Sequence, residues 1–277
     1  MRRRCRSGDA VTSASIRRRA PGRFLALSIG AAALPAAAFQ PLVTDDTGTQ
    51  GKGGNQVELS VDEDRTREAG ETTRTRTVPF TFTRGLTDTL DVFAGISNVR
   101  IHSSTPGAGA SGSGNPVLGA KWRFHETEES KTSFALKPEI LLPVSRAREE
   151  SGLGNGKVSG ALTLVATREV PFGAVHANLA VARHRFRDPE AARSTVVGAS
   201  IAPVWDVAPQ WKLALDVGYE REKAGGVTTR ARYAELGAIY SPSEDLDFAL
   251  GVIRGTNSAD PRAWTSSATL GVTWRFR

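Results

Sequence analysis

The sequence predicts an all-β protein that folds as a transmembrane antiparallel up-and-down β-barrel of about twelve strands. Three observations predict this class. Apolar residues recur at every second position in short blocks, which is the pattern of strands with one apolar and one polar face. No apolar run after residue 38 approaches the roughly 18 residues that a membrane helix needs. The connections between blocks alternate between short and long, as they do at the two ends of an outer-membrane barrel.

Residues 1–38 are predicted to be a signal peptide. A basic stretch around Arg17 to Arg23 precedes the apolar stretch Phe24 to Leu34, and Ala36 to Ala38 provide a small-residue cleavage site. Eight arginines and one aspartate in this leader account for the whole net charge of +7. The remaining chain carries 28 basic and 28 acidic groups and no cysteine, because Cys5 lies in the leader. This balance argues against nucleic acid as a partner.

The segment 39–55 has no strand pattern. It contains proline, several glycines and the adjacent acids Asp45 and Asp46. Two interpretations stay open for it: a disordered periplasmic end, or a plug that folds into the lumen of the barrel.

The barrel itself is predicted to span 56–277. The block 211–219 shows the alternation most clearly, with Trp211, Leu213, Leu215, Val217 and Tyr219 on one face. The same period gives twelve strands in all, whose apolar positions lie within 57–61, 78–82, 90–96, 118–124, 134–142, 162–164, 175–181, 197–205, 211–219, 236–240, 246–252 and 268–276.

The connections between these strands predict short periplasmic turns and longer extracellular loops. A soluble β-sandwich offers no reason for this asymmetry. The tighter connections are 85–88, 125–130, 170–171, 208–210 and 242–245. The longer, polar or glycine-rich ones are 66–73, 102–114, 145–156, 187–193, 223–229 and 257–262.

Aromatic residues of the apolar phase gather near the short-turn ends of their strands, as in an interfacial girdle. Trp122, Trp211, Phe248 and Trp274 are examples, and Tyr219 and Trp264 are candidates for a sparser girdle at the loop end.

The opposite phase of the strands combines small and polar residues with charges of both signs. Twelve strands enclose less space than the 16 to 18 strands of porins, so a narrow or occluded lumen is expected. Lumen charges either pair and close the barrel or select what passes. The candidates that line the lumen are Lys121, Lys137, Glu139, Asp216 and Glu235.

Three stretches carry a resemblance to a known family. Phe39 to Asp46, the turn Arg84 to Asp88, and Leu118 to Phe124 (LGAKWRF) are similar to outer-membrane barrels of the MetA pathway of phenol degradation. The resemblance covers most of the mature chain. It implies a channel or transporter for small, hydrophobic or aromatic molecules in the bacterial outer membrane, and it brings no catalytic residue.

The residues themselves predict no catalytic site, no metal site and no cofactor. The Gly-rich runs lack the Lys-Ser or Lys-Thr pair of a phosphate loop. His102 beside Ser103 and Ser104 is the best candidate for a nucleophile and base, but adjacent residues of a strand point to opposite faces.

The sequence therefore favours a monomeric passive channel, whose partners are outer-membrane lipids, the insertion machinery and an unidentified solute. A structural or adhesive barrel with a filled lumen is the alternative. A lipid hydrolase is the third and weakest hypothesis.

Overall fold

The computed structural model describes residues 40–68, 70–187, 193–258 and 263–277, and these form one closed antiparallel sheet. The predicted signal peptide lies outside the described residues. The strands are β1 (Asn55–Glu68), β2 (Glu71–Gly85), β3 (Leu90–Ser103), β4 (Ala110–Ser113), β5 (Val117–Thr127), β6 (Thr132–Leu141), β7 (Ser159–Val170), β8 (Gly173–Arg185), β9 (Arg193–Ala208), β10 (Trp211–Ala224), β11 (Val227–Ser243), β12 (Leu246–Asn257) and β13 (Trp264–Phe276).

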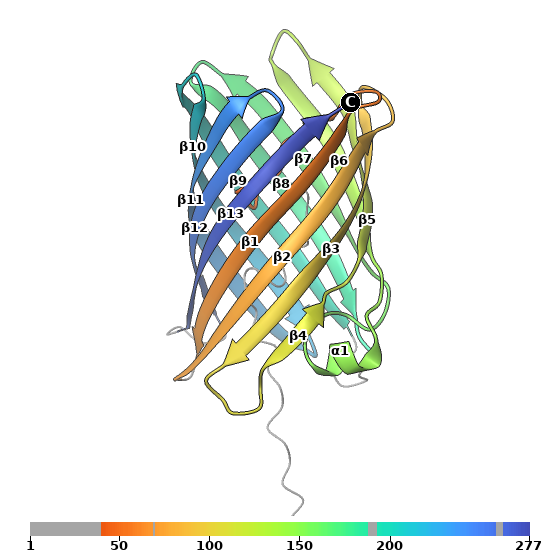
Figure 1. Cartoon of the computed structure of the whole chain (residues 1–277), viewed down its shortest axis with the longest axis vertical. Coiled ribbons are helices and arrows are strands. Elements are labelled where there is room, and N and C mark those ends of the chain that lie inside the picture. Colours follow the sequence, from red (N-terminus) through yellow and green to blue (C-terminus); the bar gives the residue numbers. More distant parts are fainter. Residues whose placement is uncertain (1–39, 69, 188–192, 259–262) are drawn as a thin grey trace, which may run out of the picture.

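Neighbours in the chain are neighbours in the sheet, and the barrel closes where β1 pairs with β13 (Figure 1). Two of the thirteen strands share one position. β5 pairs with Leu90–Gly95 of β3, and β4 pairs with Asn98–Ile101 farther along the same strand. The described residues thus form the predicted twelve-stranded barrel, with β4 as an additional short strand.

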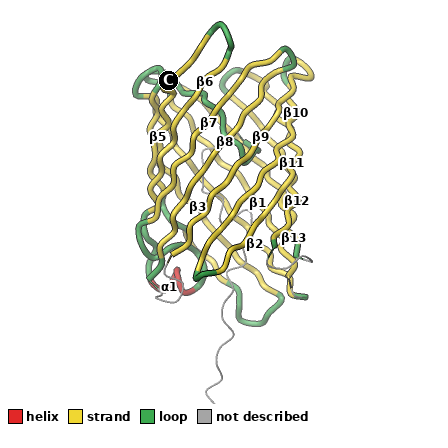
Figure 2. The backbone as a smooth tube through the Cα atoms, turned by 180° about the vertical axis from the view of Figure 1, so that it is seen from behind, coloured by secondary structure: helices red, strands yellow, loops and turns green. Residues whose placement is uncertain are grey.

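The turns that the sequence predicts to be short lie at one end of the barrel, together with the C-terminus (Figure 1). We call this the periplasmic end and the opposite one the extracellular end, following the usual arrangement of transmembrane barrels. The extracellular end carries the connection 142–158 with the short helix α1 (Arg146–Glu150), as Figure 2 shows. No helix among the described residues is long and apolar enough to cross a membrane.

The outer surface is apolar, as the strand periodicity predicts. On β10, Trp211, Leu213, Val217 and Tyr219 are exposed, whereas Ala214 and Asp216 of the other phase are buried. Aromatic rings meet at the periplasmic end, where the centroids of Trp211 and Tyr240 are 4.8 Å apart and those of Trp274 and Phe276 are 4.6 Å apart. These rings are placed as an interfacial girdle requires.

Two of the predicted long loops are wrong. β1 runs to Glu68 and β2 begins at Glu71, and β10 runs to Ala224 and β11 begins at Val227. The second pair is joined by Gly225 and Gly226, whose positive φ angles of 55° and 84° fit a tight hairpin. The apolar alternation ends earlier than the strands do, because both faces of a strand that leaves the membrane meet water.

Candidate functional site

Residues 40–54, which we call the lumenal segment, precede β1 and run into the barrel from the periplasmic end. Two backbone bonds anchor the segment at the mouth: Gly53 N donates to Gly85 O (3.0 Å), and Gly85 N donates to Gly54 O (2.9 Å). Next, Gln50 N donates to both carboxylate oxygens of Asp91 on β3, at 3.0 and 3.2 Å. The segment therefore enters the lumen with its outer part fixed to β2 and β3.

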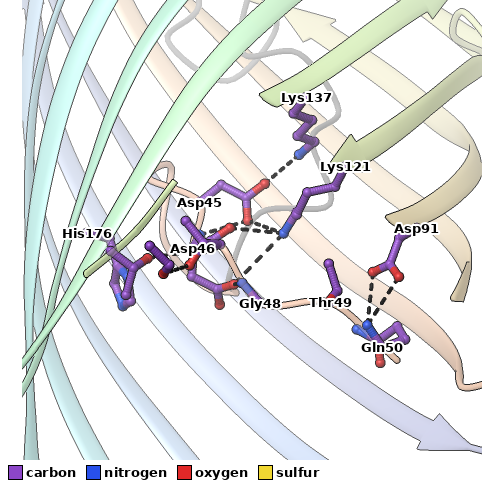
Figure 3. A network of polar contacts seen from close by, with 12 residues as sticks. Asp45, Asp46, Gly48, Thr49, Gln50, Asp91, Lys121, Lys137 and His176 are labelled. Atoms are coloured by element: carbon purple, nitrogen blue, oxygen red, sulfur yellow. Dashed lines mark hydrogen bonds and ion pairs between the residues drawn. The ribbon is translucent and has the colours of Figure 1, made fainter. Parts of the chain in front are cut away.

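Asp45 is the electrostatic centre of the lumenal segment (Figure 3). The ammonium group of Lys137 lies 2.7 Å from Asp45 Oδ2, and that of Lys121 lies 2.9 Å from Oδ1. All three side chains are almost completely removed from solvent. Burial alone would raise the pKa of the Asp45 carboxyl, but the two ammonium groups outweigh burial and hold that pKa below its ordinary value.

Beyond Asp45 the segment reaches the opposite wall. Thr44 N donates to Asp216 Oδ2 (2.7 Å), and the Thr44 hydroxyl donates to Asp216 Oδ1 (2.8 Å). Val43 N donates to Glu235 Oε2 at 3.3 Å. Carboxylates of β10 and β11 thus satisfy backbone N–H groups that no strand neighbour satisfies, as buried amides require.

Apolar contacts hold the innermost part. Leu42 is buried in a cluster with Ala202, Val204 and Ala214 on the inner face of β9 and β10. The barrel wall is also hollowed here by glycine. A Cβ atom at Gly251 would lie 2.9 Å from Pro41 Cβ, so the lack of a side chain at this position leaves room for the segment.

Four of the five predicted lumen residues contact the segment: Lys121 and Lys137 bind Asp45, Asp216 binds Thr44, and Glu235 binds Val43. Glu139 is buried too, but neither of its carboxylate oxygens has a hydrogen-bond partner among the described residues. A role of these five side chains in solute selection stays a prediction.

Sequence reasoning missed Asp45 and Thr44 as functional residues. Both precede the first strand, where no periodicity assigns a side chain to a face. The signal available was the pair of adjacent acids Asp45 and Asp46 in a segment without secondary structure, together with lysines on the inward phase of the next strands.

A cavity of about 570 Å³ remains between the lumenal segment and the barrel wall at the periplasmic mouth. Gln50, Glu58, Asp91 and Arg275 are among its lining residues, and Phe93 adds an aromatic ring. The mouth therefore has room for a small organic molecule beside the segment.

The hydrolase hypothesis gains no geometric support at His102. His102 is exposed on the outer face, whereas Ser103 lies on the inward phase of β3. Ser103 Oγ accepts a hydrogen bond from Thr105 N, and Ser104 Oγ accepts one from Thr72 N. Both hydroxyl oxygens therefore accept backbone hydrogen bonds at the ends of the strands.

A closed antiparallel barrel with an apolar outside, an aromatic girdle and a polar, charged inside defines the class of transmembrane barrels of the bacterial outer membrane. The sequence profile of the family described as "Putative MetA-pathway of phenol degradation" matches residues 44–276, and the chain belongs to this family. The match includes Asp45, Lys121 and Lys137.

Solved structures agree with this fold. An outer membrane channel from Pseudomonas putida F1 is 14% identical with a TM-score of 0.68, and the alignment covers 83% of this chain and 98% of the channel. The NanC porin is 8% identical with a TM-score of 0.50, and the alignment covers 78% of this chain and 98% of the porin. At these identities the likeness shows the fold alone. No curated protein sequence matches the chain.

Proposed function

We propose that this protein is a passive outer-membrane channel for small apolar or aromatic molecules, and that the lumenal segment is its gate. One observation carries the proposal: a segment that belongs to no strand crosses the lumen of a closed barrel and is held there by the buried carboxylate of Asp45 between Lys121 and Lys137.

The contacts of the segment suit a gate better than a permanent filling. A buried ion pair contributes little net stability, because desolvation of the charges offsets much of their attraction. Removal of one partner is costly, since it leaves the other charges buried and unpaired. The docked state therefore depends strongly on the Asp45 carboxylate, and loss of its charge weakens docking of the segment.

The family supports the substrate class, since its description refers to phenol degradation. The lumen offers matching chemistry near the mouth. Phe93, Val117 and Leu141 form a buried apolar cluster on the inner wall, and Phe93 also borders the mouth cavity. An apolar patch within a wall of hydroxyl and carboxylate groups suits a small aromatic ring that bears one polar group.

Single-channel conductance in planar bilayers tests the gate. Asp45→Asn removes the carboxylate that lies closest to both Lys121 and Lys137, and it is expected to weaken docking of the segment by about 3–5 kcal/mol. We expect long-lived open states in this variant and rare ones in the wild type. Asp46→Asn is the matched control, because the Asp46 side chain is partly exposed and its carboxylate lies 3.8 Å from Lys121.

Equal conductance of Asp45→Asn and the wild type would contradict the gate. If all variants are also impermeable to phenol in liposome uptake assays, the channel itself is refuted, and the alternative of a structural barrel with a filled lumen is then favoured. If the wild type takes up phenol and Asp45→Asn takes up phenol equally fast, the channel hypothesis stands and only the gate hypothesis is contradicted.

A further inference from the structure

The outer face of the barrel carries a band of arginine side chains at the extracellular end. On β1 to β3 these are Arg65, Arg74, Arg76 and Arg100, all exposed. Arg65 lies directly opposite Arg74, and Arg76 lies directly opposite Arg100. Arg76 also forms an ion pair with Glu63 on the same face.

The same arrangement recurs on the strands β8 to β11. Arg185 lies directly opposite Arg193, and Arg221 lies directly opposite Arg230. On the described extracellular ends of β8 to β12, every charged side chain of the outer phase is basic.

Like charges that face each other across a strand pair destabilise a sheet. Glu63 already pairs with Arg76, so the other three facing arginine pairs call for an anion that binds between them. Two neighbouring guanidinium groups offer several N–H donors in fixed planes, which is the geometry that binds phosphate oxygens in a bidentate manner.

The position of these pairs relative to the membrane identifies the anion. Tyr219, the last apolar-phase residue of β10, lies opposite Arg232, and Arg221 follows two residues later, about 7 Å farther along the strand. The guanidinium group of Arg254 lies 3.9 Å from the ring centroid of Trp264. Tyrosine and tryptophan mark the level of the lipid headgroups, so the arginines lie at or just beyond that level.

The periplasmic end differs. No register of the described strands places two arginines opposite each other there, and the exposed charges have both signs, as at Glu126, Lys131, Arg168 and Glu169. A general need for solubility would not confine an arginine band to one end of the barrel.

We propose that the facing arginine pairs bind the phosphate groups of glycolipids in the outer leaflet of the outer membrane. The partner is a phosphorylated lipid whose acyl chains cover the apolar face while its phosphates lie between the guanidinium groups. This inference is independent of the gate, because none of these side chains points into the lumen.

The test uses the purified full-length barrel in detergent and measures binding of bisphosphorylated lipid A by native mass spectrometry. At about 1 kcal/mol for each basic residue near an anionic lipid surface, Arg221→Gln/Arg230→Gln is expected to bind about 10- to 30-fold more weakly. The control Lys131→Gln/Arg168→Gln removes two exposed charges from the periplasmic end and is expected to bind like the wild type.

Arg221→Lys/Arg230→Lys keeps both charges and the fold but removes the planar fork, and an intermediate loss of several-fold is expected. Lipid A without phosphates is expected to bind the wild type and both Arg221/Arg230 variants equally weakly. Unchanged binding in Arg221→Gln/Arg230→Gln, or an equal loss in the Lys131→Gln/Arg168→Gln control, would overturn the proposal. Displacement of the lipid by millimolar inorganic phosphate would also overturn it, because the pairs would then be sites for a soluble anion.

Discussion

Docking of the lumenal segment depends most on one side chain, the carboxylate of Asp45. Its contacts with Lys121 and Lys137 are strong only while it is ionised, so docking of the segment is linked to pH. Other titratable groups lie close to Asp45, and their effects on the pH dependence of docking must be distinguished from the effect of Asp45. These groups are Asp46, Glu58, Glu139 and His176.

The pH dependence of conductance follows from the lowered pKa of Asp45. A carboxyl whose pKa is lower in the docked state stabilises that state fully above its ordinary value of 3.8, and this stabilisation is lost as the pH falls through the lowered pKa. We expect the channel to stay closed from neutral pH to about pH 4 and to open below it. In Asp45→Asn this acid-induced step should be absent, and a step of equal size there would assign the effect to a different group.

Single residues were predictable only where a strand placed them. Lys121, Lys137, Asp216 and Glu235 were recognised because the two-residue period assigned them to the inward phase. Their partners Thr44 and Asp45 follow no period, so their pairing depends on a three-dimensional path that a local pattern does not encode.

At the scale of the element, the inner faces of β11 and β12 are shaped to receive the segment. Gly237 and Gly251 face Pro41, and a Cβ atom at either would approach it to 3.0 Å or less. The strands therefore provide a depression where a side chain would otherwise stand.

Gly251→Ala is expected to displace Pro41 and to raise the open probability of the channel. A Cβ atom there would also lie 2.5 Å from Oε1 of Glu235, whose other oxygen accepts the N–H of Val43, so the overpacking cost of about 1–3 kcal/mol falls on the docked segment and on the wall residue that binds it. Gly198→Ala is the control, because a Cβ atom there would meet its nearest neighbour at an ordinary 3.5 Å. Conductance traces of both variants decide the matter, and identical traces would contradict this role of Gly251.

The number and order of strands were predictable because each membrane-crossing stretch must present an apolar residue at every second position. The ends of the strands were not. Thr66 to Thr73 contains no large apolar residue, and this composition fits a loop as well as it fits a strand that extends beyond the membrane.

For the whole molecule, the lack of cysteine after Cys5 permits a clean covalent test of the gate. The hydroxyl oxygens of Thr44 and Ser200 are 2.7 Å apart, so sulfur atoms in their place need only a small approach to form a disulfide bond of about 2.05 Å. In Thr44→Cys/Ser200→Cys, oxidation should lock the segment across the lumen and suppress conductance, and reduction should restore it.

Thr44→Cys alone serves as the control for this experiment. It loses the hydroxyl bond to Asp216 but has no partner for a disulfide, so its conductance should not respond to oxidant. A double variant that conducts equally when oxidised and reduced would show that the path does not pass the segment.

The lumenal segment is joined to β1 through Gly53 and Gly54, and this covalent link changes the nature of the closing step. A released segment remains tethered to the mouth of its own barrel, at an effective concentration on the order of millimolar. Closing is then a first-order event whose rate does not depend on how many copies occupy the membrane. A separate peptide with the sequence of residues 40–50 would have to reach millimolar concentrations before it competed with the resident segment.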